Sequence, residues 1–176
     1  MVVIETERLR LRQLNLNDCE FILQLLNDPD WLRFIGDRQV RSFEDANQYL
    51  TNGPIAMAEK YGHALMMVET KSGNTKIGLC GLIRRDTLPD VDLGYAYLPQ
   101  FRGQGYALEA ASATLNYGFK DLNLSKIVAI TTQDNEASIR LLGKLGFEYE
   151  EVFNSSDDDV PLNLYGKSAP ICPAFP

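Results

Sequence analysis

The sequence has little of what metal-dependent and nucleophilic enzymes use. It contains one histidine, His63, so a metal site built from several histidines is excluded. Its three cysteines, Cys19, Cys80 and Cys172, are far apart and form no Cys-x-x-Cys pair. A Ser-His-Asp or Cys-His arrangement would depend on His63, which lies in strand-like sequence. We therefore expect no metal site, and we expect reduced thiols in a reducing compartment.

Long apolar runs and an excess of positive charge are also missing. No apolar run reaches the roughly 18 residues that a membrane span needs, and the first residues do not resemble a signal peptide. Lys and Arg total 17 against 24 Asp and Glu, a net charge of −7. This balance disfavours nucleic-acid binding and suits a cationic partner. We expect a soluble, cytoplasmic protein that binds neither membrane nor nucleic acid.

What is present suits one mixed domain. The 176 residues are 45% hydrophobic and 23% charged, as in an ordinary globular protein. No repeat, linker or low-complexity segment divides them. We predict a single domain over 1–176, with an irregular proline-rich tail from about residue 168 to 176.

Hydrophobic spacing predicts the order of the elements. Strands are expected at 4–12, 63–70, 76–85, 91–98 and 126–132, and two more between 148 and 167 around the acidic turn 155–159. A first helix is expected to begin at the Asn17-Asp18 cap and to end at 28–30, and a second is expected to begin at Ser42. Two more are expected over 105–121 and 135–145, the last ending at Gly146 as a left-handed cap. Hairpin connections before residue 98 favour an antiparallel sheet. The fold class is therefore α/β (α+β), with a mixed, mostly antiparallel central sheet flanked by helices.

The segment from Asp92 to Ala107 carries chemistry, because it runs from strand through a glycine loop into a helix. Gly103 and Gly105 let backbone N–H groups turn toward one point, where the helix dipole also favours an anion. A phosphate or pyrophosphate is the expected ligand. No Gly-Lys-Ser/Thr follows, which excludes a Walker loop, and Leu108 stands where a dinucleotide fingerprint needs its last glycine.

These residues resemble a known family. Gln100-x-x-Gly103-x-Gly105/Ala107 resembles the acetyl-CoA pyrophosphate loop of the GCN5-related N-acetyltransferases (GNAT). The block from Asn135 to Phe147 resembles that family's Asn-x-x-Ser/Ala helix ending in Lys-x-Gly-Phe, and Glu5 to Arg12 is similar to the opening of its ribosomal-protein N-terminal acetylating (RimJ/RimL-type) subgroup. The resemblance covers about residues 4 to 152. It implies a single GNAT-like domain that uses acetyl-CoA as co-substrate, without a metal.

The resemblance also implies which residues bind the cofactor. The strand backbone would hold the pantetheine arm at Ala96, Tyr97 and Leu98. The pyrophosphate would be held by N–H groups of the loop, from Arg102, Gly103, Gln104, Gly105, Tyr106 and Ala107. Asn135 would hydrogen-bond the cofactor arm, although an asparagine there is equally suited to cap the helix. The alternative is that the glycines serve only to form a tight strand-to-helix turn and bind no ligand.

The implied reaction is direct attack of an amine on the thioester carbonyl, in a ternary complex. Many family members protonate the leaving thiolate with a tyrosine at the position of Leu142 here. The Rim-type subgroup offers a serine instead, and Ser138 fills that position, where it would relay a proton or hydrogen-bond the sulfur. Asp92 is the candidate base, acting through water, with a solvated strand-end carboxylate as the alternative. Glu109, one turn inside the loop helix, could simply favour the helix dipole, and Glu148, Glu150 and Glu151 could line the acceptor groove.

The acceptor is expected to be a primary amine, either a protein N-terminus or a small cationic molecule. Such an amine would be drawn to a negative groove shaped by residues 28–62. Two alternatives stay open: a non-catalytic acyl-CoA-binding module, which Leu142 favours, and a partner-binding domain that kept only the fold. The protein is expected to be a monomer or a homodimer.

Overall fold

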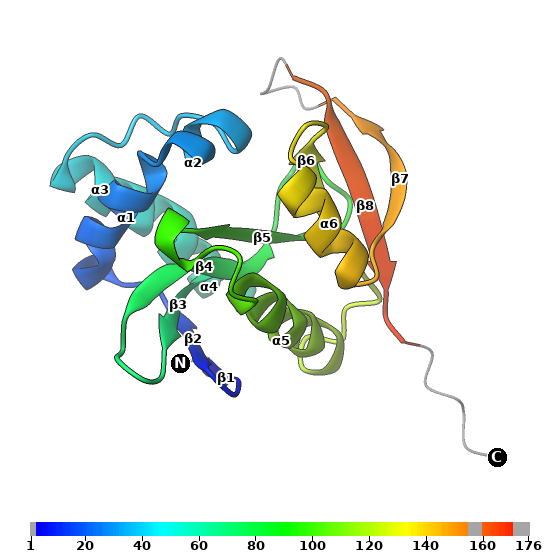
Figure 1. Cartoon of the computed structure of the whole chain (residues 1–176), viewed down its shortest axis with the longest axis horizontal. Coiled ribbons are helices and arrows are strands. Elements are labelled where there is room, and N and C mark those ends of the chain that lie inside the picture. The colour runs from blue at the N-terminus through cyan, green and yellow to red at the C-terminus, as the bar shows by residue number, and fades with distance from the viewer. Residues whose placement is uncertain (1–2, 155–159, 171–176) are drawn as a thin grey trace.

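One eight-stranded sheet runs through the molecule. The computed structural model describes residues 3–154 and 160–170. The spatial order of the strands is β1-β2-β3-β4-β5-β6-β8-β7, and every neighbouring pair is antiparallel except β5 and β6. Their bounds are β1 Val3–Glu5, β2 Leu9–Gln13, β3 Leu65–Thr70, β4 Lys76–Ile83, β5 Val91–Tyr97, β6 Lys126–Thr132, β7 Glu148–Phe153 and β8 Leu162–Ser168. The predicted mixed, mostly antiparallel sheet is confirmed (Figure 1).

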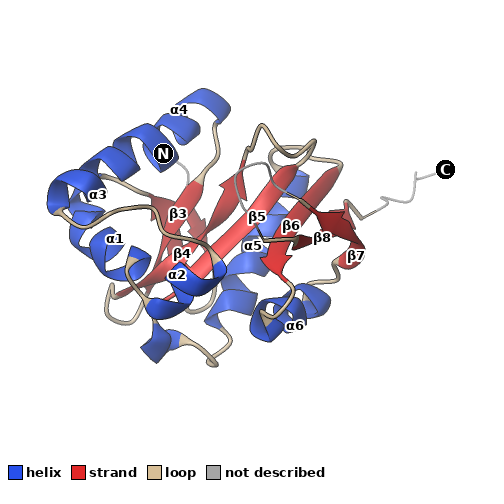
Figure 2. Cartoon of the chain, turned by 90° about the horizontal axis from the view of Figure 1, so that it is seen from above, coloured by secondary structure: helices blue, strands red, loops and turns tan. Residues whose placement is uncertain are grey.

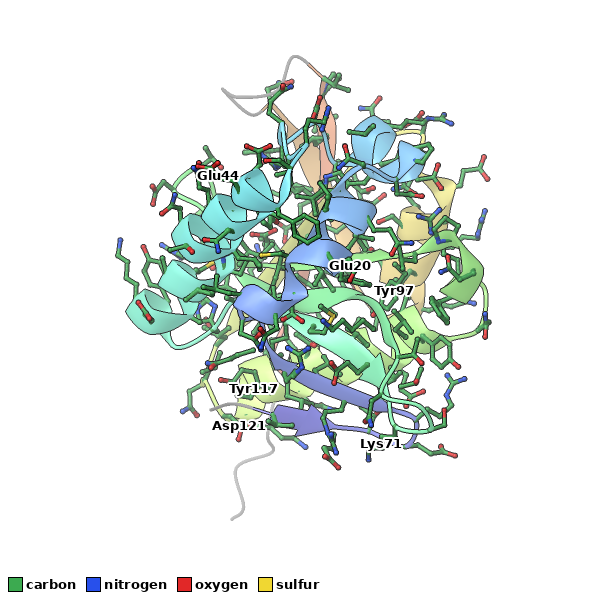
Figure 3. The ribbon with its side chains drawn as sticks, turned by 90° about the vertical axis from the view of Figure 1, so that its left-hand side faces the viewer. Glu20, Glu44, Lys71, Tyr97, Tyr117 and Asp121 are labelled. Carbon is green, nitrogen blue, oxygen red and sulfur yellow. The ribbon has the colours of Figure 1, made fainter. Side chains whose placement is uncertain are left out.

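Helices cover both faces of this sheet. The α-helices are α1 Cys19–Leu26, α2 Pro29–Phe34, α3 Phe43–Leu50, α4 Ala56–Tyr61, α5 Tyr106–Lys120 and α6 Glu136–Lys144. Shorter turns are a 3-10 helix at Leu16–Asp18, a π-helical turn at Thr51–Ile55 and a 3-10 helix at Pro99–Phe101. Figure 2 shows α1, α3 and α4 together on one side of the sheet. Glu20 on α1 and Glu44 on α3 lie on the outer surface of that layer (Figure 3).

Strand alternation divides the core into two layers. Met66 and Val68 on β3 belong to the cluster that packs under α5 and α6, whereas Met67 between them packs with α1 and α3. Successive side chains of a strand point to opposite faces, so a strand buried on both sides carries apolar residues at every position. The sheet is therefore covered by helices on both faces. The described parts of the chain hold no helix long and apolar enough to cross a membrane.

The sheet opens between β5 and β6, and this opening positions the site. β5 pairs with β4 along its length, from Ile83↔Asp92 to Gly78↔Tyr97. It pairs with β6 only at Val91↔Ile127 and Asp92↔Val128. Beyond Asp92 the β6 side of β5 has no strand partner, so its backbone polar groups are available to another extended chain.

The N-terminal third differs from the sequence prediction in three places. Residues 4–12 form two strands, not one, because the Thr6 hydroxyl and backbone turn back onto Leu9. Asp28 does not simply end a helix: its side chain accepts a hydrogen bond from the Asp30 N–H and caps α2, with Pro29 in the first turn. The π-helical turn and α4 were not expected, because Pro54 interrupts the helical pattern and α4 has no fully buried side chain.

Other local predictions are confirmed. Ser42 caps α3 in a reciprocal box with Asp45, and Gly146 follows α6 with a φ of +78°. Cys19 and Cys80 are buried free thiols. The acidic turn 155–159, Cys172 and most of the proline-rich tail lie outside the described residues.

Candidate functional site

A long cleft of about 1360 Å³ lies over the open edge of β5. Its walls come from α2 and the segment after it on one side and from α6 and the end of β6 on the other, on opposite sides of β5 in Figure 1. Such a volume exceeds that of most small-ligand pockets, so the cleft has room for a large ligand or for two ligands side by side.

The loop between β5 and α5 presents unpaired backbone donors to the cleft. Gly103 and Gly105 adopt φ angles of +72° and +81°, a left-handed region that favours glycine. The N–H groups of Gly103, Gly105, Tyr106 and Ala107 have no acceptor among the described residues, and all four residues line the cleft. With the positive end of the 15-residue α5 behind them, these donors are arranged in a way that suits an anion.

Arg8 holds this loop from the far side. Its Nε lies 2.6 Å from Glu109 Oε2, its Nη1 donates to the Gln104 carbonyl at 3.0 Å, and its guanidinium stacks 4.5 Å from the Tyr106 ring centre. Burial raises the pKa of Glu109, but hydrogen bonds from Thr6 and Arg8 outweigh it and hold that pKa below its ordinary value. Glu109 does not line the cleft. It therefore supports the loop and is no candidate base.

Arg102 ties the loop to α2. Its Nε donates to the Tyr97 carbonyl at 2.8 Å, its Nη2 lies 2.7 Å from Asp28 Oδ1, and its Nη1 pairs with Asp30. The backbone N–H of Arg102, predicted as a phosphate donor, instead donates to the Pro99 carbonyl at 3.2 Å. The cap of α2 and the anion-binding loop are thereby fixed relative to each other.

The structure brings some predicted cofactor residues to the cleft and leaves others out. Ala96 and Tyr97 line it, and Figure 3 shows Tyr97 near the start of α5. Leu98 does not: its side chain is buried between the helices of the other face, and its N–H donates to the Ile77 carbonyl at 3.0 Å. Gln104 also faces away, with its side chain bound to the Gln100 carbonyl at 2.8 Å.

The start of α6 reaches the cleft from the opposite wall. Asn135 Oδ1 accepts a hydrogen bond from the Ser138 N–H at 3.1 Å, so this residue is the helix cap. Its Nδ2 has no acceptor among the described residues, and both Asn135 and Ser138 line the cleft. The cap therefore leaves one amide donor to offer to a ligand.

Ser138 has a partner that sequence reasoning missed. The Tyr95 hydroxyl lies 2.7 Å from Ser138 Oγ, between β5 and α6. Burial raises the pKa of Tyr95 to about 12, so its hydroxyl keeps its proton at neutral pH. Alternation along β5 could have placed Tyr95 on the same face as Tyr97, but no local signal links it to a serine 43 residues later.

Asp92 lies at the bottom of the cleft where β5 and β6 separate. Its side chain is 1% exposed, and both carboxylate oxygens lie 3.1 Å from Arg85 Nε. Burial raises the pKa of Asp92 to about 6, although Arg85 acts in the opposite direction. The alternative of a solvated strand-end carboxylate is wrong. A carboxylate that titrates this close to neutrality is suited to accept a proton.

The remaining candidates lie elsewhere. Leu142 is fully buried in the core below α6. Glu148, Glu150 and Glu151 lie exposed on the edge strand β7, where Glu150 pairs with Lys126 at 2.7 Å, and none lines the cleft. His63 Nδ1 bonds the Leu82 carbonyl at 2.9 Å. Within the described ranges no group of three or more His, Cys, Asp or Glu side chains is placed to hold a metal ion.

The charge of the cleft differs from the predicted negative groove. Four described carboxylates line it, and each is in an ion pair with an arginine: Asp28 and Asp30 with Arg102, Asp92 with Arg85, and Asp134 with Arg33. The cationic lining residues are more numerous: Arg33, Arg38, Arg84, Arg85, Arg102, Arg140 and Lys144. Among the described residues, the cleft is therefore positive in a protein of net charge −7.

Comparison with known sequences identifies similar proteins. A family model described as an acetyltransferase (GNAT) domain matches residues 8–148. The chain is 34% identical over 152 residues to the uncharacterised N-acetyltransferase YoaA of Bacillus subtilis, with 85% of each chain covered. It is 27% identical over 142 residues to the spermidine N(1)-acetyltransferase of Escherichia coli, covering 80% of this chain and 73% of that protein.

Solved structures share the fold. An acetyltransferase of the GNAT family from Bacillus anthracis superimposes with a TM-score of 0.78 at 25% identity, covering 95% of this chain and 98% of that one. RimL, a ribosomal alpha-N-protein acetyltransferase solved in complex with coenzyme A, superimposes with a TM-score of 0.82 at 18% identity, covering 96% and 98%. The second likeness supports the fold only.

Proposed function

Because the chain belongs to the GNAT family of acetyltransferases, we propose that it is an acetyl-CoA-dependent N-acetyltransferase that acetylates a primary amine by direct attack in a ternary complex. The observation that carries this proposal is the row of unpaired N–H groups from Gly103 to Ala107 beside the open edge of β5. The diphosphate of acetyl-CoA matches the N–H groups of the loop, and its amide-containing pantetheine arm matches the open edge of β5.

The cofactor would be held mainly by backbone groups. The N–H groups of Gly103, Gly105, Tyr106 and Ala107 would bind the pyrophosphate, with Lys144 nearby on the same cleft. The pantetheine arm would add to the open edge of β5 near Ala96 and Tyr97, as an extended peptide adds to a sheet, while the Tyr97 carbonyl stays bound to Arg102 Nε. Asn135 Nδ2 would donate to a carbonyl of that arm.

Three groups serve the chemical step. Asp92 would accept, through a water molecule, the proton that the attacking amine loses as its C–N bond forms. Ser138 would donate a hydrogen bond to the sulfur as the C–S bond breaks. Tyr95, in turn, would donate to Ser138 Oγ, and such a chain polarises the donor at its end. Neither hydroxyl needs to lose its proton, since the released thiolate can take one from solvent.

Leu142 favours a second candidate. Its full burial leaves the cleft without the tyrosine that many family members carry at this position, as in a module that binds acyl-CoA without turnover. The Tyr95–Ser138 pair favours turnover over that reading, because in the proposed complex it would supply a hydrogen-bond donor to the leaving sulfur.

The test is a calorimetric titration with acetyl-CoA, with NADH as the control ligand, followed by mass spectrometry of a panel of primary amines incubated with acetyl-CoA. We expect one micromolar site for acetyl-CoA, no binding of NADH, and acetylated product. Binding without product would favour the binding module. Absence of acetyl-CoA binding would contradict both candidates, since it would leave the glycine turn without a ligand.

A further inference from the structure

The two ends of the cleft carry different kinds of groups. One end is the Gly103–Ala107 loop. The other, which we term the acceptor end, is lined by Arg38, Tyr49, Arg84, Arg85 and Asp92. Asp92 precedes Tyr97 by five residues of extended strand, about 17 Å along β5. A ligand seated on the loop therefore leaves the arginines of the acceptor end for a second molecule.

These arginines converge from separate elements. Arg38 lies between α2 and α3, whereas Arg84 and Arg85 follow β4. Burial raises the pKa of the Tyr49 phenol on α3, while the charges of Arg38 and Arg85 both act to lower it, so both guanidinium groups lie within electrostatic range of one hydroxyl. Two segments that are distant in sequence thus present positive charge to one phenol on a third segment.

Two of the three arginines have no carboxylate partner in the part of the chain that the structure describes. Arg84 Nη1 donates only to the Pro89 carbonyl, at 2.9 Å, and Arg38 makes no ion pair. Arg85 shares its charge with the buried Asp92. Exposed guanidinium groups bind carboxylates through paired N–H donors, and an arginine cluster is the usual protein surface for that group.

The geometry points to an acceptor that carries negative charge: we propose that the acceptor end binds a carboxylate on the same molecule as the reacting amine. This inference rests on the proposed acetyl transfer and names its substrate class. A polyamine would place its second ammonium among Arg38, Arg84 and Arg85, and the described carboxylates of the cleft are already paired. An acidic peptide N-terminus or an amino acid carboxylate would meet the opposite charge.

The same arginines also serve the reaction. An amine must lose its proton before it attacks, and nearby positive charge lowers the pKa of an ammonium group. Binding through the carboxylate would bring the amine into this field and toward Asp92. Recognition and deprotonation would therefore use one set of side chains.

The experiment compares three peptide amides that share one primary amine and differ in charge: Ala-Glu-Glu-Ala, Ala-Gln-Gln-Ala and Ala-Arg-Arg-Ala, with spermidine as a fourth acceptor. At about 50 mM salt we expect kcat/KM for the acidic peptide to exceed that of the neutral one about tenfold, with the basic peptide and spermidine lowest. Raising salt to about 500 mM should compress these ratios, because exposed charges are then screened. Equal or higher rates for the basic peptide would overturn the inference.

A charge-reversal variant gives the matched control. Arg38→Glu with Arg84→Glu should reverse the order of acidic and basic peptides while leaving acetyl-CoA affinity unchanged. Arg10→Glu with Lys120→Glu changes net charge equally at exposed positions outside the cleft and should keep the wild-type order. Reversal by both variants would assign the preference to overall charge and contradict a site at the acceptor end.

Binding separates this inference from the proposed function. Calorimetric titration of the three peptides in the presence of CoA does not need turnover. Tighter binding of the acidic peptide, lost in the Arg38→Glu/Arg84→Glu variant, would support the acceptor end even if no peptide were acetylated, and acetyl transfer alone would then be in doubt. Equal or absent binding of all three would overturn the carboxylate site, whatever the enzyme does with acetyl-CoA.

Discussion

The two ends of the cleft are built in opposite ways. The loop end is one contiguous segment, 99–109, that offers backbone N–H groups held by Arg8, Glu109 and Arg102. The acceptor end draws side chains from three separate segments: Arg38, Tyr49, and the stretch from Arg84 to Asp92. Backbone donors depend on conformation and hardly on neighbouring side chains, whereas a side-chain site changes with each substitution. If the two ends serve as we propose, the site that holds the co-substrate depends mainly on backbone conformation and the site that chooses the acceptor depends mainly on side chains.

The largest effect is expected at the loop. In Gly105→Glu, the new Cβ would lie 3.3 Å from Arg8 Nη2 at a φ of +81°, so the substitution strains the loop backbone and displaces the arginine that holds it. We expect acetyl-CoA affinity to fall at least about 100-fold, or about 2.7 kcal/mol, by calorimetric titration. Gly62→Glu is the control, because Gly62 has a similar φ of +77° and open space beside it but lies outside the loop. Unchanged affinity in Gly105→Glu would contradict the loop assignment.

The next effect is expected at the boundary between the two ends. Asp92→Asn removes the proposed base, and we expect kcat to fall about 10- to 100-fold with acetyl-CoA affinity unchanged. In the wild type, kcat should fall as pH drops below about 6, where Asp92 becomes protonated, and the variant should lose this limb. A pH–rate profile of both proteins checks this. The same limb in both would assign the titration to another group.

Asp92 also makes stability depend on pH. Its pKa rises from 3.8 to about 6 on folding, so the folded state binds the proton more tightly. The resulting stabilisation is fully present below pH 3.8 and is lost as pH rises through about 6. We therefore expect the wild type to gain stability relative to Asp92→Asn as pH falls from 7 to 4, measured by urea unfolding. A constant difference across this range would show that burial does not shift the pKa of Asp92.

A smaller effect is expected at the Tyr95–Ser138 hydroxyl pair, which joins β5 to α6. Ser138→Ala should lower kcat about tenfold without changing acetyl-CoA affinity, and Tyr95→Phe should lower it less, because Tyr95 acts through Ser138. The double variant should cost no more than Ser138→Ala alone, as for residues that act in one chain. Single-turnover rates provide the measurement. Additive losses would mean that the two hydroxyls act separately.

The smallest effect separates a cap from a ligand contact. Asn135→Ala and Ser42→Ala each remove a helix cap and should each cost about 1 kcal/mol, lowering Tm by about 2–4 °C. Only Asn135→Ala should also weaken acetyl-CoA binding, since only Asn135 lines the cleft. Equal acetyl-CoA affinity in both variants would leave Asn135 as a cap and nothing more.

Local patterns predicted much of this molecule. The loop glycines, the Ser42 cap and the Gly146 turn follow from the conformations that single residues favour, and the structure places them as expected. Local patterns failed where the same residues can either end one helix or begin another. Asp28-Pro29 ends one helix and begins the next, and no pattern in 51–61 announced α4.

Contacts between distant segments were beyond such patterns. The Tyr95–Ser138 hydrogen bond, the Arg102 bridge to Asp28 and the pairing of every described cleft carboxylate with an arginine join residues 7 to 101 positions apart. Net charge predicted a negative groove, because it averages over the whole surface. The described lining of the cleft is positive, since folding gathered arginines from several elements along its walls.

The sequence alone indicated the family, the strands and helices from residue 63 onward, and the glycine loop, because each of these signals depends on residues that lie close together along the chain. The tertiary structure decided which hydroxyl faces Ser138, how far burial shifts the pKa of Asp92, and which charge the acceptor meets. Those properties depend on distance in space and on exclusion of water, and neither exists until the sheet and its helices have packed.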